Sequence, residues 1–325
     1  MKETSPLRML VSALIEPSRC GALTPRAWNE LLLAARAQGL LARLAHALAD
    51  AGAFEAAPPK ARAHLIAARI AADSTRTAVR FEINRILRAV DGLDVPIVLL
   101  KGAAYAHAGL PSARGRLIGD LDLMVPRVAI GAIEKALVTG GWIPSDMDDY
   151  DQHYYREWMH EIPPLQHPDR DTPVDIHHSI TPSSGRFAVD GATLYAASLE
   201  MADRRLRVLA PADMVLHCAA HLFNTEVGKP LRDLFDLRDL LIHFSREAGF
   251  WSNLQARARL LGLERPLHYA LRHARRLLDA PVPPGVELAA AAAAPAAPQQ
   301  VLMDWLFGEL LLPDTSQKFR AGAAL

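Results

Sequence analysis

The sequence predicts an α+β protein, in which a core made of a mixed sheet with helices is flanked by helical regions on both sides. Residues 1–90 and 191–325 are dominated by stretches rich in Leu, Ala and Arg, with apolar residues at helical spacing. Residues 91–190 instead contain short β-rich apolar runs separated by Gly, Pro and Asp. We therefore expect an N-terminal helical region (1–90), a core (91–190) and a C-terminal helical region (191–325).

Both flanking regions contain several long helical patterns. Thr24-Pro25 resembles an N-cap followed by proline at the first helical position. An alanine-rich stretch at 289–297 is expected to be a linker or a weak helix. The expected helices cover residues 28–48, 60–90, 210–221, 231–244, 254–278 and 301–312.

The core is expected to alternate strands with helices. Gly140-Gly141 would end its second helix. The acidic segment SDMDDYDQ is expected to be a loop. Helices are expected at 102–110 and 128–138, and strands at 95–100, 117–125, from Trp142, and in HYYREWMHEI and TPVDIHHSI, which PLQHPDRD joins as a turn.

Composition excludes several classes of protein. Lys plus Arg equals Asp plus Glu at 36 each, which argues against a surface built for long nucleic acids. Cys20 and Cys218 cannot form a disulfide framework, so a reducing cytoplasm is the expected location. Neither a signal peptide nor an apolar run long enough to span a membrane is evident, so we expect no membrane partner.

The segment LIGDLDLMV places two carboxylates together. Side chains alternate across a strand, so Asp120 and Asp122 share one face. Their repulsion costs from ~1 kcal/mol in water to ~4 kcal/mol near a protein surface, and a bound cation relieves it. Mg²⁺ prefers such carboxylates together with phosphate oxygens. Alone, the motif favours an exposed edge strand with acids on its solvent face, so the neighbouring residues decide between the two interpretations.

Three neighbouring features favour a metal and phosphate site. Gly119 lets the backbone approach a ligand closely. Lys101-Gly102 follows an apolar run and opens a helix, whose N-terminus attracts anions. Asp175, on another β-like run, is a candidate third carboxylate. We expect Lys101→Ala to weaken nucleotide binding more than folding; the alternative is that Lys101 pairs with one of the acids.

Together these segments resemble the bacterial uncharacterised nucleotidyltransferase family of the DNA polymerase β-like superfamily. The resemblance rests on Leu-Lys-Gly (100–102), on Arg-Leu-Ile-Gly-Asp-Leu-Asp-Leu-Met-Val (116–125) and on Asp-Ile-His (175–177). Residues 210–241 also resemble that family's C-terminal part, and the likeness covers roughly residues 30–245. Two departures are Gly102-Ala103, where the superfamily usually has Gly-Ser or Gly-Gly, and Asp175, where close relatives often have Glu.

The resemblance implies a polymerase β-like core and transfer of a nucleoside monophosphate from an NTP such as ATP to a hydroxyl, with release of pyrophosphate. Asp120 and Asp122 would hold two Mg²⁺ ions, with Mn²⁺ as an alternative. Asp175 would bind the catalytic metal or take the acceptor proton. Nucleotide-binding residues would be Lys101, Gly102, Arg116, Gly119 and His177.

Several histidines allow two interpretations. His177 shares a face with Asp175, and a ligand contact or a structural role fits it equally. His217 and His221 lie one helical turn apart, a spacing that can bind a metal. Without an adjacent His-Asp pair, helix packing is the simpler role for them, and lining an acceptor pocket is the other.

The sequence leaves the acceptor of the nucleoside monophosphate undetermined. Neutral charge and the lack of mixed aromatic and basic patches favour a small molecule or a protein. The alternatives are a toxin-like enzyme that modifies RNA ends and a noncatalytic nucleotide-binding partner protein. Loss of one of the three acids would favour a noncatalytic partner protein, but all three acids are present.

Overall fold

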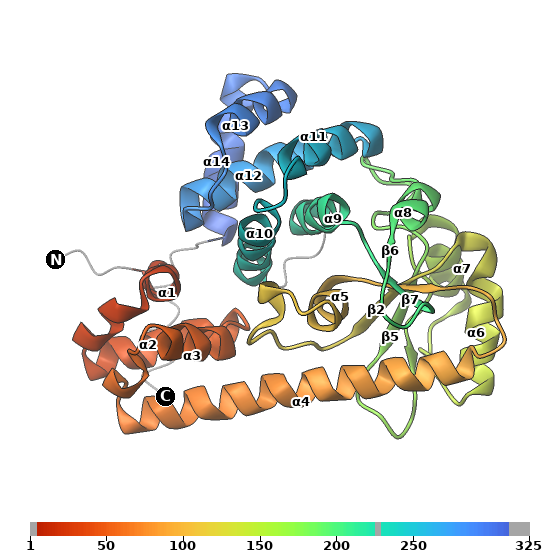
Figure 1. Ribbon diagram of the computed structural model, residues 1–325, viewed down its shortest axis with the longest axis horizontal. Coiled ribbons are helices and arrows are strands. Elements are labelled where there is room, and N and C mark those ends of the chain that lie inside the picture. Colours follow the sequence, from red (N-terminus) through yellow and green to blue (C-terminus); the bar gives the residue numbers. More distant parts are fainter. Residues whose placement is uncertain (1–4, 225–228, 312–325) are drawn as a thin grey trace.

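The protein is described by a computed structural model in residues 5–224 and 229–311. A mixed sheet occupies one end of the molecule, and a bundle of short helices lies at the other (Figure 1). The long helix α4 (Pro59–Ala89) runs along one side and joins the two ends. The predicted α+β class, with helices before and after the sheet, is confirmed.

The sheet has the strand order β3-β4-β5-β2-β1-β7-β6. Its central strand β2 pairs antiparallel with β1 and parallel with β5. The strands are β1 (Ile97–Leu99), β2 (Leu121–Met124), β3 (Ile143–Pro144), β4 (Leu165–Gln166), β5 (Val174–His177), β6 (Leu199–Glu200) and β7 (Leu206–Val208). All residues of β1 and β2 are buried, as expected for strands covered on both faces.

Helices before the sheet form the N-terminal end. They are α1 (Pro6–Ile15), η1 (Pro17–Ala22), α2 (Pro25–Ala37), α3 (Leu41–Asp50), η2 (Phe54–Ala56) and α4. Thr24 caps α2 as predicted, because its side chain accepts a hydrogen bond from the Ala27 N–H.

The remaining helices come between the strands along the chain or follow the last strand. They are α5 (Lys101–His107), η3 (Pro111–Ala113), η4 (Arg127–Ala129), α6 (Ile130–Thr139), α7 (Asp149–Trp158), α8 (Gly191–Ala197), α9 (Pro211–Asn224), α10 (Pro230–Phe244), α11 (Phe250–Leu261), α12 (Glu264–Leu278), α13 (Pro284–Ala290), η5 (Ala291–Ala293) and α14 (Ala297–Leu311). Within the described ranges, no helix combines the length and hydropathy that crossing a bilayer requires. The last residue of the helix expected at 301–312 lies outside the described residues.

Two helices predicted as continuous are each divided in two. The pattern at 28–48 divides between α2 and α3, where Gly39 has a φ of 65°. The pattern at 254–278 divides between α11 and α12, where Gly262 has a φ of 66°. In both cases glycine takes the left-handed conformation that ends a helix, and the apolar period resumes after it.

The predicted strand at HYYREWMHEI is wrong. Most of it belongs to α7, which also takes in the second half of the acidic segment predicted as a loop. Tyr150, Tyr154 and Trp158 recur every four residues, a helical period that their β-forming side chains obscured. The end of this segment contacts the sheet, through a bridge between Glu161 and His177 and a hydrogen bond from the Ile162 N–H to the Ile176 carbonyl.

The sheet also extends beyond residue 190, where the sequence predicted helices alone. β7 pairs parallel with β1, and β6 pairs antiparallel with β7. The alanine-rich stretch at 289–297 divides between the ends of α13 and α14 and the 3₁₀ turn η5. The turn PLQHPDRD contains the short strand β4. Strands of two or three residues carry too little sequence pattern to be predicted.

Ion pairs join the N-terminal helices to the rest of the chain. Arg43 on α3 donates to Asp236 at 2.6 Å and also to Asp239, both on α10, and to the Ser112 carbonyl at 3.1 Å. These bonds fix α3 against the turn that precedes Arg116.

We predict that Gly115→Ala destabilises the protein much more than Gly52→Ala. Both glycines have positive φ, 72° and 65°, so an alanine costs about 1 kcal/mol at either site. At Gly115 a Cβ would also lie 2.6 Å from the Arg43 backbone nitrogen, whereas Gly52 has open space. The clash adds about 1–3 kcal/mol. Urea denaturation of the two variants checks this, and equal losses would contradict the crowding.

Candidate active site

Three carboxylates meet at the adjoining strands β2 and β5. The register pairs Asp122 directly with Asp175, and Asp120 stands two residues before Asp122 on the same face. One oxygen from each of the three lies within 4.8 Å of the others. The structure therefore brings together the three acids predicted from the sequence, although Asp120 precedes the first residue of β2.

Asp122 is the most buried of the three, at 3% exposure. Its Oδ1 accepts a hydrogen bond from Lys101 Nζ at 2.7 Å and lies 3.0 Å from His177 Nε2. Burial alone would raise the pKa of Asp122, but Lys101 and His177 outweigh it and hold the pKa far below its usual value. Both contacts use Oδ1, so Oδ2 is the oxygen left to face a cation.

The pKa values of Asp175 and Asp120 are shifted in the opposite direction to that of Asp122. Burial, and then the charge of Asp122, raise the pKa of Asp175 to about 7, and they raise the pKa of Asp120 as well. Asp175 Oδ1 is buried and has no hydrogen-bond partner. A buried carboxylate oxygen in that state lacks a counter-charge, and a hard divalent cation between the three acids would supply it. The residues present therefore fit a Mg²⁺ site.

Lys101, the first residue of α5, has a strained backbone conformation. Its φ is 44°, in the left-handed region that side chains with a Cβ seldom adopt. Such strain costs roughly 1–3 kcal/mol and persists where the surrounding contacts require it. Here this conformation directs Nζ at Asp122. The structure therefore shows the predicted alternative for Lys101, pairing with one of the acids.

Gly102 is required by close packing. A Cβ at this position would lie 2.8 Å from Nε of Arg116 and 3.4 Å from the Ile118 side chain. At Gly119, by contrast, a Cβ would meet nothing within 4 Å. Gly102 is therefore required by the packing against Arg116 and Ile118, whereas Gly119 leaves room beside Asp120.

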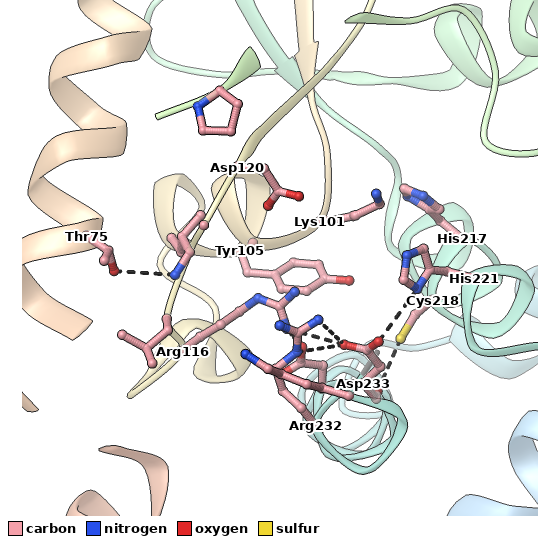
Figure 2. A pocket seen from close by; sticks show the side chains of 17 residues that line it. Thr75, Lys101, Tyr105, Arg116, Asp120, His217, Cys218, His221, Arg232 and Asp233 are labelled. Carbon is pink, nitrogen blue, oxygen red and sulfur yellow. Dashed lines mark hydrogen bonds and ion pairs between the residues drawn. The ribbon is translucent and has the colours of Figure 1, made fainter. Parts of the chain in front are cut away.

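A cavity of about 480 Å³ opens beside Asp120, the member of the three carboxylates that lines it. This volume falls within the range of pockets that bind small ligands. Figure 2 shows Lys101 and Asp120 on one side of it and Arg116, Arg232 and Asp233 on the other. Its polar side chains belong to Thr75, Lys101, Tyr105, Arg116, Asp120, His217, Cys218, His221, Lys229, Arg232, Asp233 and Asp236.

Arg116 lies in the wall of this cavity. It is ion-paired with Asp236, lies 3.8 Å from Asp233 Oδ1, and has its guanidinium 5.8 Å from the Tyr105 ring centre. The charge of Arg116 is thus paired with the acids of α10. A phosphate would share this guanidinium with the acids of α10.

The predicted histidines separate into two groups. His177 is 1% exposed and lies beneath Asp122, outside the cavity lining, so its contacts indicate that it positions Asp122. His217 and His221 on α9 both line the cavity. Burial lowers the pKa of His221 to about 4 and that of His217 well below its usual value, so both are neutral at pH 7.

Sequence reasoning did not single out several residues of this site. Thr75 accepts a hydrogen bond from the Ile118 N–H at 3.3 Å, although the two lie far apart in the chain. Tyr105 comes from α5, and Lys229 and Arg232 come from the start of α10. No local motif marks these residues, since they reach the site only through the packing of α4, α5 and α10.

The chain belongs to a family described as uncharacterised nucleotidyltransferase, whose model matches residues 24–279. This membership confirms the resemblance expected from the sequence and the enzyme class.

Among solved structures, the chain is similar to the solution structure of the antibiotic-resistance factor ANT(2'')-Ia. The identity is 21% and the TM-score 0.38, over 60% of this chain and 99% of that one. A comparison with curated proteins finds no match.

We predict that Asp175→Asn stabilises the metal-free protein at pH 8 and has little effect at pH 5. The folded-state pKa of Asp175 is raised from 3.8 to about 7, so the wild type loses stability as the pH rises from about 4 to 7. Asn cannot ionise and avoids this loss. Thermal melts in EDTA should show a difference of roughly 2–5 °C at pH 8.

The exposed Asp171→Asn serves as the control for this series. A difference between Asp175→Asn and wild type that is the same at pH 5 and pH 8 would contradict the raised pKa.

We also predict that Lys101→Ala destabilises the free protein, unlike the expectation drawn from the sequence. The substitution leaves the buried Asp122 with His177 alone. Loss of one partner of a buried ion pair typically costs about 3–5 kcal/mol. In a double-mutant cycle with Asp122→Asn, the two changes should couple by about 1–3 kcal/mol. Additive effects in urea denaturation would show that the pair is energetically unimportant.

Proposed function

We propose that this nucleotidyltransferase moves a nucleoside monophosphate from an NTP to a hydroxyl of a small molecule or protein, using Mg²⁺. The observation that carries the proposal is the convergence of Asp120, Asp122 and Asp175, with an unpartnered buried oxygen, beside a cavity lined by cationic side chains. Nucleotidyl transfer needs these two parts, a cation site and an anion-binding wall, in contact with each other.

Asp120 and Asp122 are proposed to hold two Mg²⁺ ions, with Mn²⁺ as a substitute, and Asp175 to share one of them or to take the acceptor proton. The bound ions would neutralise phosphate oxygens and stabilise the charge that develops on the leaving pyrophosphate. The raised pKa of Asp175 suits the second role, since a base with a pKa near 7 can accept a proton at neutral pH.

Lys101, the Gly102 backbone, Gly119 and Arg116 are proposed to bind the triphosphate. Lys101 is 22% exposed at its side chain and lines the cavity, so its ammonium can face a phosphate while it remains beside Asp122. Gly119 leaves space next to Asp120. His177, which contacts Asp122, is proposed to hold this metal ligand in position.

The acceptor is proposed to enter the part of the cavity formed by α9 and α10. There the neutral His217 and His221 face the acidic and basic side chains of α10. A cavity of about 480 Å³ holds a small molecule or a single protruding side chain.

We predict transfer of label from α-³²P-NTP, but not from γ-³²P-NTP, to an acceptor in a cell extract supplied with Mg²⁺. Asp120→Asn should lower the rate about 10²-fold or more, because the amide keeps the shape and removes the charge that holds the metal. Asp171→Asn, on the exposed surface, should transfer label like the wild type.

The labelled molecule then identifies the acceptor by its size and its sensitivity to protease or nuclease. Label on RNA would replace the proposed acceptor class by RNA ends. Equal labelling by wild type and Asp120→Asn, or transfer of the γ-label, would contradict the proposed reaction.

A further inference from the structure

A second group of metal-binding side chains lies on the other side of Asp122 from Lys101. His177 contacts Asp122 through Nε2, and its Nδ1 lies 3.2 Å from Glu161 Oε2. His160 Nε2 lies 4.0 Å from the same Glu161 oxygen. The rings of His160 and His177 have centroids 5.2 Å apart. Two imidazoles and one carboxylate therefore surround a single point.

The backbone holds this group in place. The segment containing His160 and Glu161 runs antiparallel to the end of β5, where Glu161 bridges His177. The Ile162 N–H donates to the Ile176 carbonyl at 3.0 Å, and the His178 N–H donates to the His160 carbonyl at 2.8 Å. The three side chains are thus positioned by main-chain hydrogen bonds on both sides, a degree of order that a metal site requires.

The polar atoms of the group are not satisfied by one another. His177 is 1% exposed, yet its Nδ1 has no hydrogen-bond partner, because the nearby Glu161 oxygen lies outside hydrogen-bond geometry. His160 Nδ1 is also buried without a partner. With Nε2 of His177 donating to Asp122, Nδ1 presents a lone pair to the Glu161 carboxylate. Two electron-rich atoms this close repel unless a cation lies between them.

The surrounding charge favours a cation. Asp120, Asp122 and Asp175 lie together, and Glu161 lies 3.2 Å from His177, so acidic side chains are concentrated around this group.

We propose that His160, Glu161 and His177 bind one divalent transition-metal ion of the Zn²⁺ type, at a site separate from the three aspartates. Tetrahedral zinc, with bonds of about 2.0–2.1 Å to nitrogen and oxygen, separates its ligand atoms by about 3.3 Å. The 3.2 Å between His177 Nδ1 and Glu161 Oε2 matches this separation. The 4.0 Å between His160 Nε2 and Glu161 Oε2 would shorten to it by a small side-chain rotation. Imidazole ligands select zinc-like ions, whereas the all-oxygen site suits Mg²⁺.

The ion gives Asp122 a second task. A metal-bound histidine usually donates its other N–H to a carboxylate, which fixes the ring and its tautomer. Asp122 is that carboxylate for His177. Through this bond the Zn²⁺ site would hold Asp122 in place beside Asp120 and Asp175. The proposal does not depend on the reaction assigned above.

The test is metal binding by the full-length protein after removal of metals with a chelator. Titration with Co²⁺ in excess Mg²⁺ should give the intense visible absorption of tetrahedral Co²⁺ with nitrogen and oxygen ligands. Elemental analysis after equilibration with Zn²⁺ and Mg²⁺ should find one Zn²⁺ per chain. His160→Ala and Glu161→Gln should each weaken Zn²⁺ binding about 100-fold or more.

Two controls separate this site from its surroundings. His153→Ala removes an exposed histidine of α7 and should bind Zn²⁺ as the wild type does. Asp120→Asn weakens the three-carboxylate site and should also keep Zn²⁺. Circular dichroism verifies that each variant is folded. A wild type that binds no Zn²⁺, or Zn²⁺ binding that survives in both His160→Ala and Glu161→Gln, would overturn the proposal.

Discussion

The buried carboxylate of Asp122 is the constraint on which the rest of the site depends. A charge at 3% exposure is stable only with partners, and Asp122 has Lys101 on one side and His177 on the other. Lys101 reaches it through a left-handed turn at the end of β1, and His177 reaches it from the end of β5. The geometry of two strands and one turn is therefore organised around a single oxygen atom.

Other features of the site are costly for the free protein. Asp175 has a raised pKa and an unpartnered oxygen, and Lys101 has strained backbone dihedrals. Such local costs concentrate where a ligand later relieves them. The proposed reaction gives the reason, because it would bring cations and phosphates together at this place.

Much of this arrangement could be predicted from the sequence, since alternation and turn chemistry are local properties. Asp120, Asp122 and Asp175 lie as their spacing on two strands indicated, and Thr24 caps α2. Glu161 was missed because the aromatic residues before it suggested a strand, whereas they form α7. Arg116 was expected to face phosphate, and only the packing of α10 shows that Asp236 shares it. Long-range pairing of this kind leaves no local pattern.

The central claim is that the three aspartates form a two-metal site that nucleotide completes. Its most direct test is electron paramagnetic resonance of Mn²⁺ with a non-hydrolysable α,β-methylene NTP. The account predicts two bound Mn²⁺ per chain in the presence of the nucleotide analogue, with magnetic coupling between ions about 3.5–4 Å apart. Binding of the analogue that is equally tight in EDTA, with no Mn²⁺ retained, would contradict it.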